Sequence, residues 1–384
     1  MTEQTGEAAA QQENPVDERT TATRPAGGPG SPAERPSDEQ AGGRGAQMFQ
    51  GGGPARGRRR RGKRGGGEPT VVPDAEFRSY YGRPVLKAPV WDWRIPAYLF
   101  AGGLAAGSSV VAAGADLTGR PQLRRSARLG ALAGLLASTY FLVSDLGRPE
   151  RFHHMLRVFK PTSPMSVGTW ILGAFAPGAG LAAVAELVPT RWRRTWPARL
   201  IARVARPAGV SAATTAPALA SYTAVLLSHT AVPGWNEVRD ELPFVFAGSA
   251  AASGGGLGML CAPVDETGPA RVFAAVGAAG ELIASRRMDQ RMGLIGEVYH
   301  HGRVGRLRRG ADLLTLAGLA GTVLVAGRSR SGAAASGLAL LAGSALQRFG
   351  VFEAGIASTK DPRYVVVPQR ERLDAAAQAG STSA

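Results

Sequence analysis

The sequence predicts an all-α membrane protein, a bundle of eight transmembrane helices preceded by a disordered N-terminal tail. Beyond residue 94 the chain is rich in Ala, Leu, Val and Gly, and its charges are confined to short clusters between apolar stretches. A helix needs about 20 mostly apolar residues to cross the hydrocarbon layer, and eight stretches come close to that length. The first 94 residues are instead dominated by Gly, Pro, Gln, Glu and Arg, so they cannot bury enough apolar surface to fold.

Each predicted span is bounded by charged or helix-breaking residues. The first begins with Pro96, a residue tolerated at a helix start, and the second contains sixteen residues without a charge. The sixth and seventh are the weakest, because both are short and carry an acid. The eight are Ile95–Leu117, Leu129–Leu146, Met165–Val188, Ala208–Val232, Leu242–Pro263, Pro269–Ser285, Ala311–Gly327 and Ala333 to about Ala354.

Small residues recur throughout the apolar stretches, as in AGGLAAGSS and GSAAASGGGLG, and the chain holds 52 Gly. In lipid, apolar burial between helices gains little, so small residues stabilise a bundle by letting backbones approach. The glycine content therefore predicts close helix packing rather than flexible loops.

The basic run RGRRRRGKR, from Arg56 to Arg64, lies in the Gly-rich tail. It has no interleaved aromatic residues on which bases could stack, so nucleic acid is not the expected partner. Upstream of a membrane domain, attraction to anionic lipid is the better reading, worth about 1 kcal/mol for each basic residue near the surface.

A single cysteine, Cys261, limits the redox chemistry of the chain. An iron–sulfur cluster needs about four thiolates, and attached c-type haem needs a C-x-x-C-H motif. A membrane haem usually takes a histidine from each of two facing spans, and only His229 falls inside a predicted span. The sequence therefore predicts no haem and no iron–sulfur cluster in this chain.

Eight spans place both termini on one side of the membrane, here called side A, and the basic tail favours side A as cytoplasmic. Ionisable residues within spans are costly and usually functional. Most of them fall in the side-A half of their span, which predicts a polar cavity there, although charges that merely mark helix ends are the alternative. The side-A residues are Asp145, His229, Glu281, Asp312, Arg348 and Glu353; Asp116 and Glu186 lie at side-B ends.

Several segments resemble one family of membrane subunits. They are YLFAGGLAAG in the first span, LVSDLGRPERFHHMLRVFKPTSPMSVGTWIL across the second and third, SYTAVLLSHTAVPGWNEVRDELPFVFAGSAAASGGG across the fourth and fifth, and the closing QRFGVFEAGIASTKDPRYVVVPQR. Taken together in this order, D-L-G-R-P, S-P-M-S-x-G-x-W and the later Y…P-x-W are specific, and they resemble the NrfD/PsrC, or polysulfide reductase, family. The resemblance covers residues 78–370, leaving residues 1–77 as the disordered tail and 371–384 as a flexible C-terminal tail.

The resemblance implies a membrane anchor without a redox cofactor that exchanges electrons and protons with menaquinone or ubiquinone. Its implied partners are a subunit with 4Fe–4S clusters and a catalytic molybdopterin-type subunit, in a complex of the cytoplasmic membrane. The matched motifs imply Asp145, His154, Tyr222 and His229 as quinone-binding residues. A spacing of seven keeps Tyr222 and His229 on one helix face. The direction of electron flow stays open.

Two other functions remain compatible with the residues. A secondary transporter would use the side-A acids to bind a proton or cation, and a purely structural anchor would use them to hold helices together. A proton path through Glu281 and Asp312, ending at Asp116 on side B, is a further hypothesis.

Overall fold

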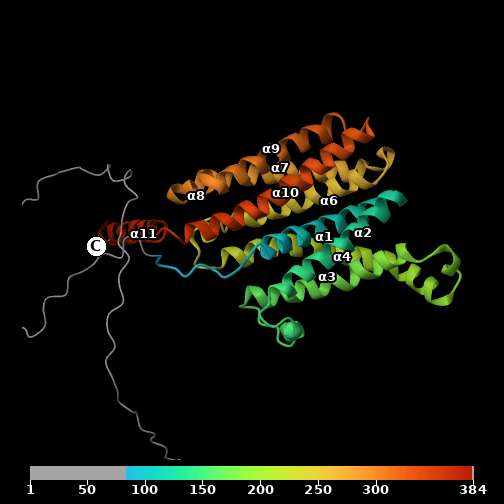
Figure 1. The fold of residues 1–384 in the computed structure, drawn as a ribbon, viewed down its shortest axis with the longest axis horizontal. Coiled ribbons are helices and arrows are strands. Elements are labelled where there is room, and N and C mark those ends of the chain that lie inside the picture. The colour runs from blue at the N-terminus through green and yellow to red at the C-terminus, as the bar shows by residue number, and fades with distance from the viewer. Residues whose placement is uncertain (1–83, 383–384) are drawn as a thin grey trace, which may run out of the picture. The chain divides into compact units, whose positions relative to one another are not determined.

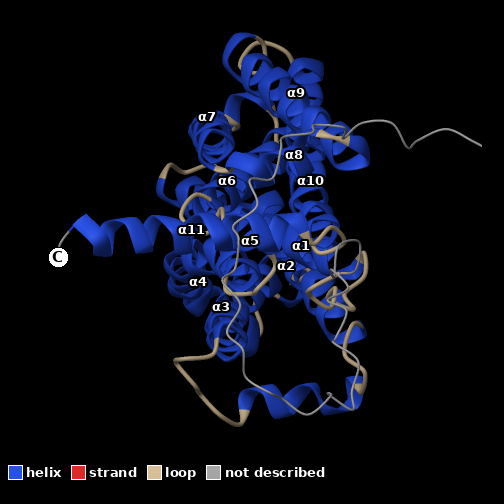
Figure 2. Ribbon diagram, turned by 90° about the vertical axis from the view of Figure 1, so that its left-hand side faces the viewer, coloured by secondary structure: helices blue, strands red, loops and turns tan. Residues whose placement is uncertain are grey.

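The computed structural model describes residues 84–382, in which helices are joined by short turns and no strand occurs (Figures 1 and 2). Eight long helices run side by side. They are α1 (Arg94–Leu117), α2 (Pro121–Ser144), α3 (Pro164–Leu187), α4 (Trp196–Ser228), α6 (Leu242–Cys261), α7 (Gly268–Arg291), α9 (Gly302–Leu324) and α10 (Arg330–Ser358). Short elements connect them: η1 (Pro149–Leu156), η2 (Thr190–Trp192), α5 (Pro233–Asn236), η3 (Val264–Glu266), η4 (Gly293–Ile295) and α8 (Gly296–His300). Helix α11 (Arg363–Thr382) follows α10.

The eight predicted spans each overlap one long helix. Five of these helices, α1, α2, α3, α4 and α6, are long and apolar enough to cross a membrane, with mean hydropathies from 1.3 to 1.5. The prediction of a helical membrane protein is therefore confirmed, while crossing by α7, α9 and α10 stays a prediction. The predicted tail of residues 1–77, including Arg56–Arg64, lies outside the described residues, and the predicted boundary at residue 371 falls within α11.

Proline begins most of the helices. Seven elements carry Pro at the first or second helical position, where the missing N–H would have no intrahelical partner and the ring fixes a helical φ. In α2 this start lies at Pro121, eight residues before the predicted span, because a basic first turn precedes the apolar residues. The basic residues Arg124, Arg125 and Arg128 thus extend α2 instead of forming a loop.

Helices α1 and α6 cross at backbone contact and join the two halves of the bundle. A Cβ on Gly107 would lie 2.0 Å from the carbonyl oxygen of Ala250, and one on Gly254 would lie 2.3 Å from the carbonyl carbon of Gly107. Around this crossing α1 also packs on α2 and α4, and α6 packs on α7 and α10. The small residues of both segments therefore act as predicted, by removing side chains where two backbones meet.

An ion network ties the side-B ends of the first helices together. Glu186 of α3 accepts hydrogen bonds from Nε of Arg124 and Nη1 of Arg128, each at 3.0 Å. Asp116 at the end of α1 lies 3.4 Å from Arg124 and 3.5 Å from Arg128. Arg206 of α4 adds a third arginine at 3.6 Å from Asp116, so this network joins the ends of α1, α2, α3 and α4.

At side A, the fully buried Trp235 holds α5 against α10. Its indole N–H donates to the carbonyl of Val351 at 2.8 Å, and a Cβ on Gly355 would lie 1.9 Å from its ring. Tyr299 of α8 donates to the carbonyl of Gly234 at 2.6 Å. The P-G-W turn and the closing R-F-G-V-F-E-A-G segment, more than 100 residues apart, therefore interlock.

Replacing Gly107 with alanine should destabilise the protein by about 1–3 kcal/mol, because the new methyl meets backbone atoms that can move only with their helices. The measurement is thermal unfolding of the purified protein in detergent. Gly180→Ala is the matched control, since a Cβ at that helical glycine meets nothing within 4 Å and alanine favours the helix. Equal melting temperatures for the two variants would refute the backbone contact.

Candidate functional site

An enclosed cavity of about 270 Å³ lies between the side-A ends of α1, α2, α3 and α4. Leucine, isoleucine and methionine side chains form most of its wall, together with Trp91 from the segment before α1. The ionisable groups that reach it are Tyr98 of α1, Asp145 at the end of α2 and Tyr222 of α4. An apolar cavity with a few convergent polar groups is the usual form of a small-molecule site.

Asp145 occupies the C-cap of α2, and its N–H donates to the carbonyl of Phe141 at 3.2 Å. Arg94 connects the start of α1 to this point, because its Nη1 donates to the carbonyl of Ser144 at 2.6 Å. Burial, together with the neighbouring Asp92 carboxylate, raises the pKa of Asp145, and Arg94 opposes the rise. Asp145 is therefore a carboxyl group at the cavity edge that holds its proton to a higher pH than an ordinary aspartate.

Tyr222 is 7% exposed and reaches the cavity over a glycine of the facing helix. A Cβ at Gly168 would lie 1.7 Å from Cζ and 2.0 Å from the hydroxyl oxygen of Tyr222. Only glycine at position 168 leaves room for the phenol in this position. Gly168 is thus a residue of the site. In the sequence it belongs to the S-P-M-S-x-G-x-W motif, but the motif does not predict its function.

The rest of the S-P-M-S-x-G-x-W motif fixes the chain that leads into α3. Ser166 accepts a hydrogen bond from the N–H of Lys160 at 3.0 Å and donates to the carbonyl of Val158 at 3.1 Å. Trp170 packs edge-on against Phe159, with ring centroids 5.9 Å apart. The motif therefore holds the η1–α3 connection beside the cavity.

The structure brings together two of the four predicted quinone-binding residues. Asp145 and Tyr222 line the cavity, whereas His154 and His229 are exposed and are not among the lining residues. Helix α4 ends at Ser228, so His229 becomes its cap, and Nδ1 of His229 lies 3.0 Å from the carbonyl oxygen of Val225. Tyr98, buried to 5% exposure, is the lining tyrosine that sequence reasoning missed, although it lies in the YLFAGG motif.

A second polar cluster is buried between α6, α7, α9 and α10. Arg348 is fully buried, stacks on the ring of Phe246 at 3.7 Å and donates to the carbonyl of Phe246 at 2.7 Å. Its charge attracts that of Glu281, which is 2% exposed. Within the described residues, Oε2 of Glu281 and two guanidinium nitrogens of Arg348 have no hydrogen-bond partner. Buried polar atoms of this kind are commonly bridged by ordered water.

The cluster continues towards side A through α9. Nη2 of Arg308 donates to both carboxylate oxygens of Asp289 at 3.0 Å, and its Nε lies 3.7 Å from Asp312. Nε2 of His300 lies 3.8 Å from the same Asp289. Glu281 and Asp312 therefore belong to one electrostatic system, whereas Asp116 lies in the arginine network at side B.

Metal ligands do not converge in this part of the chain: in residues 84–382, no three His, Cys, Asp or Glu side chains form a group that could hold a metal ion.

One comparison with known proteins finds a similar family. The family model described as "Polysulphide reductase, NrfD" matches residues 85–266. The match spans the cavity and all four helices around it. No relative is found among curated proteins.

Gly168→Ala should lower the melting temperature of the purified protein, because the methyl group cannot share space with the Tyr222 ring and the packing of α3 on α4 must open. We expect a loss of about 1–3 kcal/mol, as for an overpacked core position. The control is Gly173→Ala on the same helix, where a Cβ would meet its nearest neighbour, Leu156, at an ordinary 3.7 Å. If both variants melt like the parent protein, Tyr222 does not occupy the described position.

Proposed function

Because residues 85–266 match the family model described as "Polysulphide reductase, NrfD", we propose that the chain carries electrons and protons between an iron–sulfur partner subunit and the membrane quinone pool. Members of the family are membrane subunits of oxidoreductase complexes. The observation that carries the proposal is the enclosed side-A cavity, which joins apolar walls to a carboxyl group and two phenols.

A quinone headgroup is an apolar ring with two carbonyl oxygens that accept hydrogen bonds. The leucine and methionine walls suit the ring, and the hydroxyls of Tyr98 and Tyr222 are the donors that its oxygens need. A cavity of about 270 Å³ holds a headgroup and leaves an isoprenoid tail to the lipid. The residues present therefore fit this substrate.

Reduction of a quinone takes up two electrons and two protons, and its oxidation releases them. The electrons would come from clusters of the partner subunit, since this sequence has too few thiols to bind a cluster of its own. Asp145 is the group placed to exchange protons, because it lies at the cavity edge and a raised pKa brings it closer to neutral pH. His154 and His229, which lie on the exposed side-A surface, would exchange protons with solvent instead of touching the ring.

We further propose that Glu281 and Asp312 form a proton route in the second half of the bundle. Support comes from the burial of Glu281, its unpartnered oxygen and the chain of charged groups from Arg308 to His300. Asp116 fits this role less well, because three arginines at 3.4–3.6 Å stabilise its charge. The position of Asp116 favours a structural role, in which its ion pairs hold the helix ends together.

Substitutions in the cavity test the quinone site. Tyr222→Phe removes one neutral hydrogen bond and should weaken binding of a menaquinone analogue to the purified protein about 3- to 10-fold. Asp145→Asn should instead lower quinone reduction by the assembled complex about 100-fold, because a proton-transfer group is lost. Glu150→Gln, an exposed acid on η1, is the control for charge. If Tyr222→Phe binds the analogue as tightly as the parent and Asp145→Asn turns over normally, the cavity is not the quinone site.

The pH dependence follows from the raised pKa of Asp145. In quinone reduction the protonated carboxyl is the active form, so the rate should fall as the pH rises through this raised pKa. The Asp145→Asn variant has no carboxyl group to titrate at this position. Its residual rate should therefore not fall over the same pH range. The measurement is the rate of quinone reduction at constant ionic strength over pH 4–9. If the rate falls in the same way with rising pH in both proteins, Asp145 is not the cause of the fall.

The proton route has a separate test. Glu281→Gln should leave the affinity for the menaquinone analogue unchanged but lower the rate of proton uptake, and with it the rate of quinone reduction, in vesicles that contain the complex, by at least about tenfold if all protons take this route. Asp240→Asn, an exposed side-A acid, serves as the control. An unchanged rate of proton uptake in Glu281→Gln would remove this residue from the route.

A further inference from the structure

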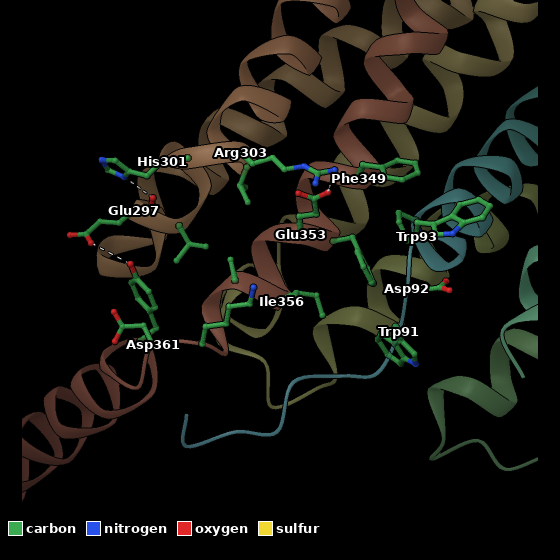
Figure 3. A pocket seen from close by; sticks show the side chains of 18 of the residues that line it. Trp91, Asp92, Trp93, Glu297, His301, Arg303, Phe349, Glu353, Ile356 and Asp361 are labelled. Atoms are coloured by element: carbon green, nitrogen blue, oxygen red, sulfur yellow. Dashed lines mark hydrogen bonds and ion pairs between the residues drawn. The ribbon is translucent and has the colours of Figure 1, made fainter. Parts of the chain in front are cut away.

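A second and larger cavity opens at side A. Its volume is about 840 Å³, and it lies between the start of α1, the α8–α9 connection, the end of α10 and the start of α11 (Figure 3). The two cavities share Trp91 as their one common lining residue. Trp91 stacks on Trp235 at 5.8 Å, and the rest of the two linings differs.

The deep part of this cavity is apolar. Phe349 and Ile356 of α10 line it on one side, and Trp93 lies towards α1 (Figure 3). Phe352 of α10 also lines it. Trp93 is 59% exposed at the end of a membrane-spanning helix. Tryptophan at such a position marks the level of the lipid headgroups. The cavity thus extends from this level along α10 towards the apolar layer.

Its rim carries charges of both signs. Arg303 of α9 and Glu353 of α10 point towards one another and meet at 3.1 Å (Figure 3). Arg363 binds Glu297 at 2.6 Å and Asp361 at 2.9 Å.

Lys360 also lines the cavity, and no ion pair recorded for residues 84–382 includes it. Four carboxylates line the cavity against three lysine and arginine side chains. They are Asp92, Glu297, Glu353 and Asp361 against Arg303, Lys360 and Arg363.

We propose that this cavity binds a zwitterionic glycerophospholipid with a primary ammonium headgroup, of the phosphatidylethanolamine type. Lys360 and Arg303 would receive the phosphate, Glu353 and Asp361 would accept hydrogen bonds from the ammonium, and one acyl chain would lie on Phe349, Phe352 and Ile356.

The charge balance selects this headgroup. Asp92 is offset by Arg94 at 3.4 Å, so the other three carboxylates balance the three cations of the rim, and a headgroup without net charge keeps this balance. A choline headgroup has no N–H to donate to the carboxylates. The proposal requires that α9 and α10 cross the membrane beside α1, but it is independent of quinone chemistry. Lipid in this groove would pack against the outer face of Trp91 and so support the wall of the first cavity.

The test is native mass spectrometry of the full-length protein. The protein in detergent is mixed with equal amounts of phosphatidylethanolamine, phosphatidylcholine and phosphatidylglycerol that carry identical acyl chains, and the lipids that stay bound after release from detergent are counted. The ethanolamine lipid should be retained about tenfold more than either competitor. Lys360→Gln should lower its retention about tenfold, the effect of losing one charge-assisted hydrogen bond. Glu353→Gln should shift the preference towards phosphatidylglycerol, because the rim then becomes more positive.

Arg370→Gln and Glu371→Gln are the matched controls, since both residues are exposed on α11 and neither lines the cavity. Equal retention of the three lipids by the parent protein would overturn the proposal, and so would variants with parent-like selectivity. Displacement of the lipid by a menaquinone analogue would also overturn it and make the groove a quinone site. Lys360→Gln alters an exposed side chain, so an unchanged melting temperature will show that it folds.

Discussion

The contact of backbone on backbone between α1 and α6 is the constraint on which the other features depend. Gly107 and Gly254 allow these helices to touch without intervening side chains, and both halves of the bundle are built outward from that crossing. Because α1 is fixed there, its side-A end stands between the two groups of helices. Each of the two side-A cavities uses this end of α1 or the segment before it as a wall.

The two cavities share Trp91 as a lining residue but differ in the polarity of their linings. In the smaller cavity, few polar groups reach an apolar space, as a neutral ring with two oxygens requires. In the larger one, ion pairs surround an open groove that aromatic residues line. Trp235, hydrogen-bonded to α10 and stacked on Trp91, keeps the wall between them rigid. Side A is therefore organised around aromatic packing, with charge arranged at its edges.

Apolar length predicted the long helices well, because crossing a bilayer imposes a length that composition alone reveals. Asp145 and Tyr222 were also correctly placed near one another, since helix direction alone brings the ends of alternate spans to the same side. His229 does not line the cavity with Tyr222, because α4 ends at Ser228 and His229 is its exposed cap. Tyr98, Gly168 and Arg94 gained their roles only in the structure, since each depends on which neighbouring helix lies opposite, and spacing within one segment carries no such information.

The α1–α6 crossing also has a consequence for how the chain is made. Gly107 and Gly254 are separated by roughly 150 residues, which at about 5–20 residues per second take about 7–30 s to synthesise. During that time the glycine face of α1 is in the bilayer without the helix that it is shaped to receive. The first four helices must then be held in a loose arrangement that α6 can still enter. Premature tight closure of α1 on another helix would be the characteristic assembly error of this protein.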